Sequence, residues 1–228
     1  MATFQRARSE EQREERRRAI LEGAAAMLAE MPVTALTLNE LSRRVGLAKS
    51  NVLRYFESRE AVLLELLTRA GDDFLRETGA ALATRVDADA PLPDRAATVA
   101  EVVADTMAAH PMLCELLSTQ ATVLEHNVST ETVTRYKHRG YATVAGLVAV
   151  LRETLPELDD TGAQEAARTV ILLTGTVWSH AHPPAAVREA YAADPALVFL
   201  PDGFAGSLRR ATEVTLVGLA ALADQRST

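Results

Sequence analysis

Residues 37–56 read TLNELSRRVGLAKSNVLRYF, and this stretch predicts two short helices joined by a tight turn. Thr37 and Glu40 have the spacing of a capping box, in which the threonine caps a helix and the glutamate reaches back to the cap amide. The first helix is expected to end at Gly46, since glycine suits the left-handed conformation beyond a helix C-terminus. A second helix is expected over about Lys49–Tyr55. The stretch therefore has the layout of a helix-turn-helix motif over about residues 38–56.

The side chains of this motif divide into an apolar set and an outward polar set. The apolar residues that can form its small core are Leu41, Val45, Leu47, Val52 and Phe56. Four polar residues of the second helix are then left facing outward: Lys49, Ser50, Asn51 and Arg54. Lysine and arginine can contact phosphates or guanine edges, and asparagine can pair with adenine. The spacing alone, however, favours an ordinary helical hairpin with a solvated polar face over a DNA-binding motif.

Helical periodicity continues along the whole chain, and prolines punctuate it. The first helix is expected from Ser9 to about Met31, where Pro32 ends it, and Ser58 is expected to cap the helix that follows the motif. Further helices are expected over 94–109, 111–125, 129–154, 161–181 and 204–223, with a short one at Ala186–Tyr191. No alternation typical of strands and no internal repeat is found, so the predicted fold is all-α.

Composition and charge predict a globular protein with an uneven charge distribution. Of the 228 residues, 48% are apolar, which is enough for a sizeable core, and the formal net charge is −7. Residues 1–60 nevertheless carry 11 Lys and Arg against nine Asp and Glu, whereas the remainder is strongly acidic. A mildly basic head on an acidic body is compatible with nucleic-acid binding. We therefore expect a DNA-binding domain over 1–60 and a second domain over 61–228.

Three segments together resemble the TetR family of bacterial transcriptional regulators. They are ILEGA at 20–24, TLNELSRRVGLAK at 37–49 and YFESREAVL at 55–63, and the resemblance covers about residues 15–65. It implies a three-helix DNA-binding head, a long fourth helix and a larger helical body that dimerises and binds an effector. Pro32-Val33 departs from the family's usual glycine-aromatic turn after the first helix.

The resemblance also implies which residues meet DNA. Lys49 should contact the DNA, Tyr55 should contact a phosphate, and Thr37 and Arg59 should face phosphates. With the outward residues of the motif, the expected DNA-binding set is Thr37, Arg44, Lys49, Ser50, Asn51, Arg54, Tyr55 and Arg59. Leu53 stands where the family often has a tyrosine that touches the DNA backbone, so either Arg54 makes that interaction or the protein lacks it.

The arginine-rich start of the chain has two interpretations. A charge run is usually a solvated helix face, and Glu14 and Arg18 have the i, i+4 spacing of an ion pair. An arm beside a helix-turn-helix can instead reach the DNA backbone or minor groove. We favour a solvated face for Arg13–Arg18, and we leave both interpretations open for Arg6 and Arg8.

The body is larger than dimerisation alone requires, and polar or aromatic residues are scattered through its apolar helices. Each one taken singly is best explained as a satisfied core group. Taken as a set, and given the resemblance, they suggest a pocket for an unknown small-molecule effector. The expected lining residues are Leu116, Gln120, His126, Asn127, Tyr141, Thr174 and Trp178.

The last two long helices, 161–181 and 204–223, are expected to form a homodimer contact, as in the family. They carry small residues among branched ones, which permits close helix approach. The residues concerned are Ala166, Ala167, Val170, Leu173, Val177, Ala211, Val214, Val217, Gly218, Ala221 and Leu222. Burial within one chain would leave the same pattern.

No catalytic constellation is found, and neither a cofactor nor a metal is expected. His180 and His182 point to different faces of a helix, and Cys114, the single cysteine, is best explained as a small buried hydrophobe. The uncharged stretch Thr169–Val187 is long enough to span a membrane, but its second half is too polar. With no secretory signal at the start, we expect a cytoplasmic protein.

The predicted function is that of a homodimeric, ligand-responsive regulator, a repressor, that binds a palindromic DNA operator. The alternative is an architectural DNA-binding protein that has no small-molecule effector.

Overall fold

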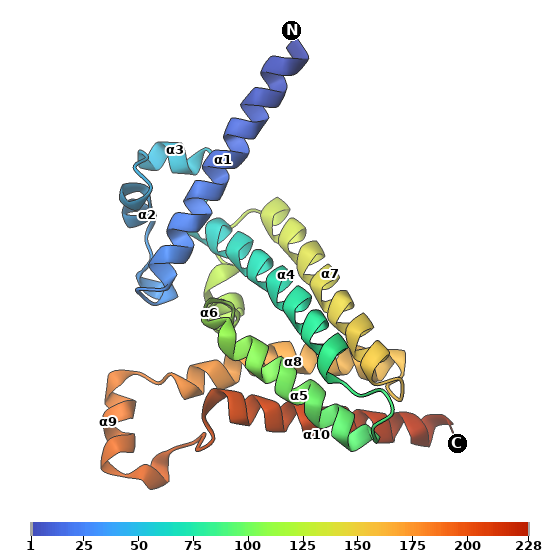
Figure 1. Cartoon of the computed structure of the whole chain (residues 1–228). Coiled ribbons are helices and arrows are strands. Elements are labelled where there is room, and N and C mark those ends of the chain that lie inside the picture. Colours follow the sequence, from blue (N-terminus) through green and yellow to red (C-terminus); the bar gives the residue numbers. More distant parts are fainter. Residues whose placement is uncertain (1, 228) are drawn as a thin grey trace. The chain divides into compact units, whose positions relative to one another are not determined.

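The computed structural model describes residues 2–227, with side chains over residues 10–226, and every described element is helical (Figure 1). The all-α prediction is therefore confirmed. The α-helices are α1 (Ala2–Leu28), α2 (Leu38–Arg44), α3 (Lys49–Leu53), α4 (Arg59–Arg85), α5 (Leu92–Ala109), α6 (Pro111–Thr119), α7 (Thr130–Thr154), α8 (Asp160–Ala181), α9 (Ala185–Ala193) and α10 (Gly203–Ser227). Short 3-10 helices lie at Val33–Ala35 and Pro195–Leu197, and a π-helix lies at Gln120–Leu124.

Two helices differ from the periodicity-based prediction. The helix expected over 111–125 is interrupted, because α6 ends at Thr119 and the chain widens into the π-helix before a turn at Asn127, whose φ is 54°. α1 begins well before Ser9, since the arginines and glutamates of its first half are good helix formers even without an apolar face.

The chain divides into two compact units. The first unit holds the residues up to Thr68 together with Thr119–Tyr136, and the second holds Arg69–Ser118 and the residues from Lys137 onward. The boundary predicted at residue 60 thus differs from the structural division, which adds two segments to the head. α4 and α7 each run from one unit into the other.

The first unit is built around the apolar stripe of α1. Ile20, Leu21, Ala24 and Met27 are buried, and so are residues from each following helix. α1 passes α2 so closely at Gly23 that a Cβ built there would lie 2.4 Å from Cγ1 of Val45. Ser58 caps α4, as expected, by accepting a 3.1 Å hydrogen bond from the Ala61 amide. The helix-turn-helix motif therefore rests on α1, which it meets through α2.

Glu57 connects the turn after α3 with the start of α7. Its carboxylate accepts a 2.8 Å hydrogen bond from the Ser129 amide, directly before α7 begins. This bond, with smaller contributions from Thr132, the Ser129 hydroxyl and Arg135, holds the pKa of Glu57 below its ordinary value. Glu57 thus supplies an anion at a helix N-terminus, where the macrodipole favours negative charge.

The second unit packs α10 against α5 and α8, with a core rich in alanine, valine and leucine. At Gly175, α8 lies directly against the backbone of α6, because a Cβ built there would lie 3.0 Å from the backbone carbonyl of Leu117. Arg95 is buried at the other end, where it donates to the Thr154 carbonyl at 2.9 Å and pairs with Glu157. This pairing lowers the pKa of Glu157.

Replacing Gly175 with alanine should destabilise the protein by about 1–3 kcal/mol, because the added methyl group meets backbone atoms that have no room to shift. Gly140→Ala in α7 is the matched control, since a Cβ placed on Gly140 would have no atom within 4 Å. That variant should gain about 0.5–1 kcal/mol from the helix propensity of alanine. Urea denaturation followed by circular dichroism measures both changes, and equal stability of the two variants would refute the close packing.

Candidate nucleic-acid interface

The turn of the helix-turn-helix motif has the geometry that the sequence predicts. Gly46 has a φ of 66°, and the Leu47 and Gly46 amides donate to the carbonyls of Ser42 at 3.0 Å and Arg43 at 3.3 Å, which is a Schellman motif. At the start of α2, the Thr37 hydroxyl accepts a hydrogen bond from the Glu40 amide at 3.2 Å. The Glu40 carboxylate binds the Thr37 hydroxyl at 3.0 Å, although we expected it to reach the cap amide.

α3 presents its polar residues to solvent. Lys49, Ser50, Asn51 and Arg54 are exposed, whereas Val52 is completely buried against the rest of the first unit. Leu53 is 41% exposed and lies beside Arg54, at the position where the resemblance suggests a missing tyrosine. In the expected small core, Leu41, Val52 and Phe56 are buried, and Val45 and Leu47 are half-buried or exposed at its edge.

Arg17 of α1 fixes the end of α3, a role that sequence reasoning missed. Its guanidinium lies 4.4 Å from the centre of the Phe56 ring, and its Nη1 donates to the Tyr55 carbonyl at 2.9 Å. It also approaches Glu14 at 3.6 Å and Glu65 of α4 at 3.9 Å. Arg18 pairs with Glu22 at 3.8 Å, so the ion pair that we expected between Glu14 and Arg18 is replaced by two others.

Two cations of the expected DNA-binding set, Arg44 and Arg59, already have partners within the first unit. Arg44 binds Glu30 through both terminal nitrogens, at 2.5 and 2.7 Å, and this lowers the pKa of Glu30. Arg59 donates to the Leu36 carbonyl at 3.0 Å and pairs with Glu60 at 3.1 Å. A phosphate contact by either residue would have to use the N–H groups that these bonds leave free, or replace the bonds.

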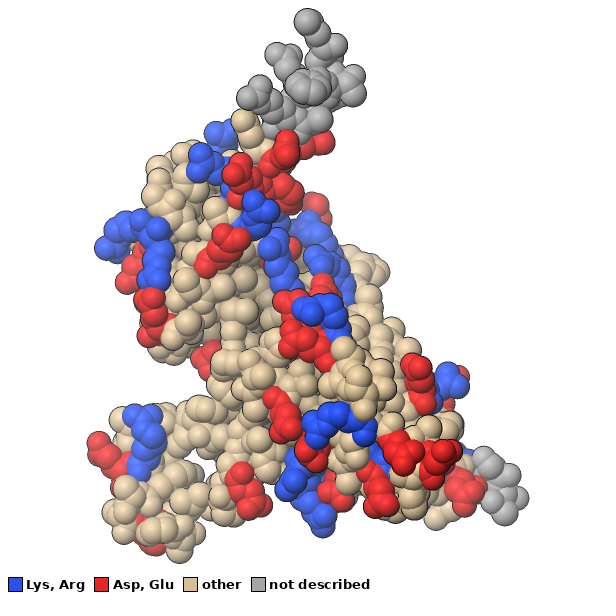
Figure 2. Space-filling model, in the orientation of Figure 1, with Lys and Arg blue, Asp and Glu red and all other residues tan. Residues whose placement is uncertain are grey.

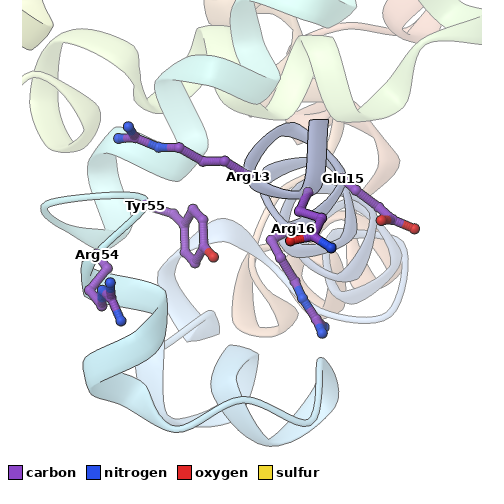
Figure 3. Close-up of a pocket in the computed structure, with 6 residues that line it drawn as sticks. Arg13, Glu15, Arg16, Arg54 and Tyr55 are labelled. Atoms are coloured by element: carbon purple, nitrogen blue, oxygen red, sulfur yellow. The ribbon is translucent and has the colours of Figure 1, made fainter. Parts of the chain in front are cut away.

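A hollow of about 640 Å³ lies between α1 and the end of α3 (Figure 3). Two of its lining residues, Arg54 and Tyr55, belong to the expected DNA-binding set. The other four come from α1 and are Gln12, Arg13, Glu15 and Arg16. Arg6 and Arg8, which we considered as an arm, lie outside the residues whose side chains the structure describes.

The surface of the first unit mixes both signs of charge. Figure 2 shows Lys and Arg atoms interleaved with Asp and Glu atoms and no continuous basic face in this view. The unpaired cations therefore identify the interface better than total charge does. Among the described residues, no ion pair or hydrogen bond is found for the side chains of Lys49, Arg13, Arg16 and Arg54.

The residues expected to line an effector pocket do not share one environment. His126, Asn127 and Tyr141 are exposed or partly exposed, Tyr141 by 72%. Leu116 and Thr174 are completely buried, and the Thr174 hydroxyl donates to the Val170 carbonyl at 2.8 Å. Gln120 is half-buried and donates to Glu125 at 2.8 Å.

The Trp178 indole is held by a hydrogen bond and by two aromatic contacts. Its indole N–H donates to Glu115 at 3.0 Å, and its ring lies 3.8 Å from that of His182 and 5.1 Å from that of Phe204. This arrangement joins α6, α8 and the start of α10, so the environment of Trp178 depends on the packing of all three helices.

The residues expected at the dimer contact fall into three groups, and the half-buried group is Leu173, Val177, Ala211 and Val217. Ala166, Ala167 and Val170 belong to the core of the second unit. Along α10, Val214, Ala221 and Leu222 are exposed and Gly218 is at least partly accessible. They recur at helical spacing and so form one face of α10. On α8, Leu172 is 72% exposed.

Within residues 10–226, no group of three or more His, Cys, Asp or Glu side chains could hold a metal ion. Burial raises the pKa of the Cys114 thiol to about 12, so the thiolate is disfavoured. In the part of the chain that the structure describes, no helix has both the length and the apolar character needed to cross a membrane.

Comparison with solved structures supports the fold. A possible TetR family regulator from Streptomyces coelicolor A3(2) aligns with a TM-score of 0.59 and 22% identity, over 90% of this chain and 99% of that one. Another TetR-family regulator from Streptomyces coelicolor gives 0.56 and 15% identity, over 93% and 83% of the two chains. A TetR regulator from Rhodococcus sp. RHA1 aligns with a TM-score of 0.55 and 15% identity, over 90% of this chain and 97% of that one.

Comparison with family models assigns both parts of the chain. Residues 20–66 match the bacterial regulatory proteins of the tetR family, and residues 69–223 match the tetracyclin repressor-like C-terminal domain. No curated protein sequence matches the chain. Since the second match alone spans more than half of the sequence, the chain belongs to the TetR family of DNA-binding transcriptional regulators.

Proposed function

We propose that the protein is a ligand-responsive repressor that binds a palindromic operator as a homodimer. The observation that carries the proposal is the outward set at the start of α3, where Lys49, Ser50 and Asn51 are exposed above a buried Val52. A short helix held this way can place its first side chains against base edges in the major groove. Arg54 and Tyr55 follow at its end, and Thr37 lies exposed at the start of α2.

The exposed apolar face of α10 supports the dimer. Val214 and Leu222 are 56% and 49% exposed, which costs hydrophobic free energy unless another surface covers them. Gly218 and Ala221 lie on the same face and permit close approach of a helix. A second copy that packs its own α8 and α10 there would bury this face and place two recognition helices on one duplex.

The size of the second unit supports an effector site. A ligand would act by binding one of two conformations more tightly, with a coupling of about 1–3 kcal/mol. Trp178 and its neighbours join three helices of this unit, so such a change should reach them. An architectural DNA-binding protein without an effector is the alternative, and it would bind DNA with an affinity that no small molecule alters.

Substitution of α3 should separate base reading from phosphate contact. Duplexes selected from a random pool by the wild-type protein supply the operator. Asn51→Ala should relax preference at one position of each half-site, because a bidentate contact is worth about 1–3 kcal/mol of discrimination. Lys49→Ala should weaken binding to the selected duplex. Arg76→Gln, whose cation pairs with Asp73 in the second unit, is the charge-matched control. Unchanged selection by both α3 variants would contradict the assignment.

Two glutamates on the exposed face of α10 should prevent dimerisation. Val214→Glu with Leu222→Glu would place carboxylates where two apolar faces meet, and burying unpaired charge is strongly unfavourable. Sedimentation velocity should show a monomer that keeps its helical circular dichroism and does not bind the operator. Tyr141→Glu is the control, since Tyr141 is at least as accessible but lies on α7. A wild-type monomer at micromolar concentration would refute the dimer.

An effector should change Trp178 emission and operator affinity over the same concentration range, because the tryptophan is the only one in the chain. Candidate molecules come from a thermal-shift screen, since a ligand of the folded state raises the melting temperature. Linkage also requires operator DNA to weaken the ligand by the same factor. A ligand that binds this unit and leaves operator affinity unaltered would favour the architectural alternative.

A further inference from the structure

We propose that the hollow between α1 and the end of α3 receives a phosphate of the DNA backbone, so that Arg13 and Arg16 add α1 to the DNA interface. The inference rests on the proposed operator binding and names a second contact surface for it. It replaces the solvated face that the charge run alone suggests for Arg13 and Arg16.

The first argument is the division of the arginines in the first unit. Arg17, Arg18, Arg44 and Arg59 each pair with a carboxylate. The side chains of Arg13, Arg16 and Arg54 have no ion pair or hydrogen bond among the described residues, and all three are exposed. These three arginines line the same hollow. Their charges are thus gathered at one place and left available to an external anion.

The second argument is the arrangement of these side chains. Figure 3 views α1 nearly along its axis: Arg13 extends toward the side on which Tyr55 and Arg54 lie, Arg16 extends downward so that Tyr55 lies between it and Arg54, and Glu15 points away from Tyr55. Glu15 is one of the lining residues, but its carboxylate points away. It therefore reduces the positive potential of the hollow only a little. Guanidinium groups bind phosphate oxygens through paired N–H donors, and the Tyr55 hydroxyl can add another.

The third argument is that both walls of the hollow are fixed. Arg17 lies one position after Arg16 in α1, and its hydrogen bond to the Tyr55 carbonyl holds α1 against the end of α3. Little backbone freedom then has to be given up when an anion binds between them, which favours affinity. The volume, about 640 Å³, exceeds that of one phosphate group and can admit a phosphodiester with its flanking sugars.

A duplex is a better occupant than a free anion because the hollow continues from the recognition helix. Arg54 and Tyr55 directly follow the residues of α3 that face outward, so a strand that α3 contacts runs close to this place. Phosphate contacts of this kind position a protein on DNA without carrying sequence information. They should therefore appear as a salt-dependent contribution that is the same for every sequence.

The test compares Arg13→Gln/Arg16→Gln with Arg18→Gln in the full-length protein. Arg18 lies on the same helix, is exposed and has only a long pair with Glu22. Binding to a labelled mixed-sequence duplex of about 30 base pairs is measured by fluorescence anisotropy over a range of NaCl concentrations, so that no operator is needed. The double variant should lower the slope of log K against log salt by about 0.9 for each phosphate that it no longer neutralises. Arg18→Gln should leave the slope unchanged, and Glu15→Gln should tighten binding.

Circular dichroism should show the same helical content and melting temperature for the double variant, since neither arginine side chain forms an ion pair or hydrogen bond within the described residues. Equal slopes for wild type, Arg13→Gln/Arg16→Gln and Arg18→Gln would overturn the inference while leaving the recognition helix intact. Sodium phosphate at matched ionic strength tests a free anion: stabilisation of wild type that is absent from the double variant, with duplex binding unchanged, would also overturn it. A wild-type protein that binds no duplex at low salt would instead refute the proposed function.

Discussion

The placement of α3 depends on one cation, Arg17. A five-residue helix has too few internal hydrogen bonds to be stable alone, so its position must come from its neighbours. Arg17 lies over the Phe56 ring and donates to the carbonyl of Tyr55, two residues beyond the end of α3. Because Arg17 also approaches Glu65, a single side chain joins α1, the end of α3 and α4. Exposure of Lys49, Ser50 and Asn51 follows from this fixed position.

The same constraint explains why arginine follows the apolar stripe of α1. Ile20 and Ala24 bury one side of the helix, and counting back by three or four residues from Ile20 reaches Arg17, Arg16 and then Arg13. The stripe therefore changes from aliphatic to cationic where α1 passes the end of α3. One of these cations has its charge satisfied within the unit. The other two line the same hollow as Arg54, which gives the first unit a local positive site in spite of its mixed surface charge.

Sequence patterns predicted the helices and the recognition motif well because both depend on local signals. The cap at Thr37, the left-handed Gly46 and the stripes of apolar residues need no knowledge of distant parts of the chain. Arg17 was not predicted because, within a run of charges, nothing local distinguishes a cation that will cover a distant phenylalanine. The expected effector residues lie in different environments for a related reason. Periodicity assigned Tyr141 and Leu116 to apolar helices, but only tertiary packing decides that one is exposed and the other buried.

The segment Thr119–Tyr136 has the chemistry of a connection between the two units. It belongs to the first unit, yet it is entered from α6 and left along α7, both of which continue in the second unit. It contains the π-helix and Asn127, whose φ of 54° is a left-handed conformation that few residues other than glycine adopt. The Ser129 amide, at the start of α7, donates a hydrogen bond to Glu57. Glu57 itself lies between the end of the helix-turn-helix motif and the start of α4. A change in α7 that weakens this bond would therefore act on the turn that ends the recognition motif, without passing through α4.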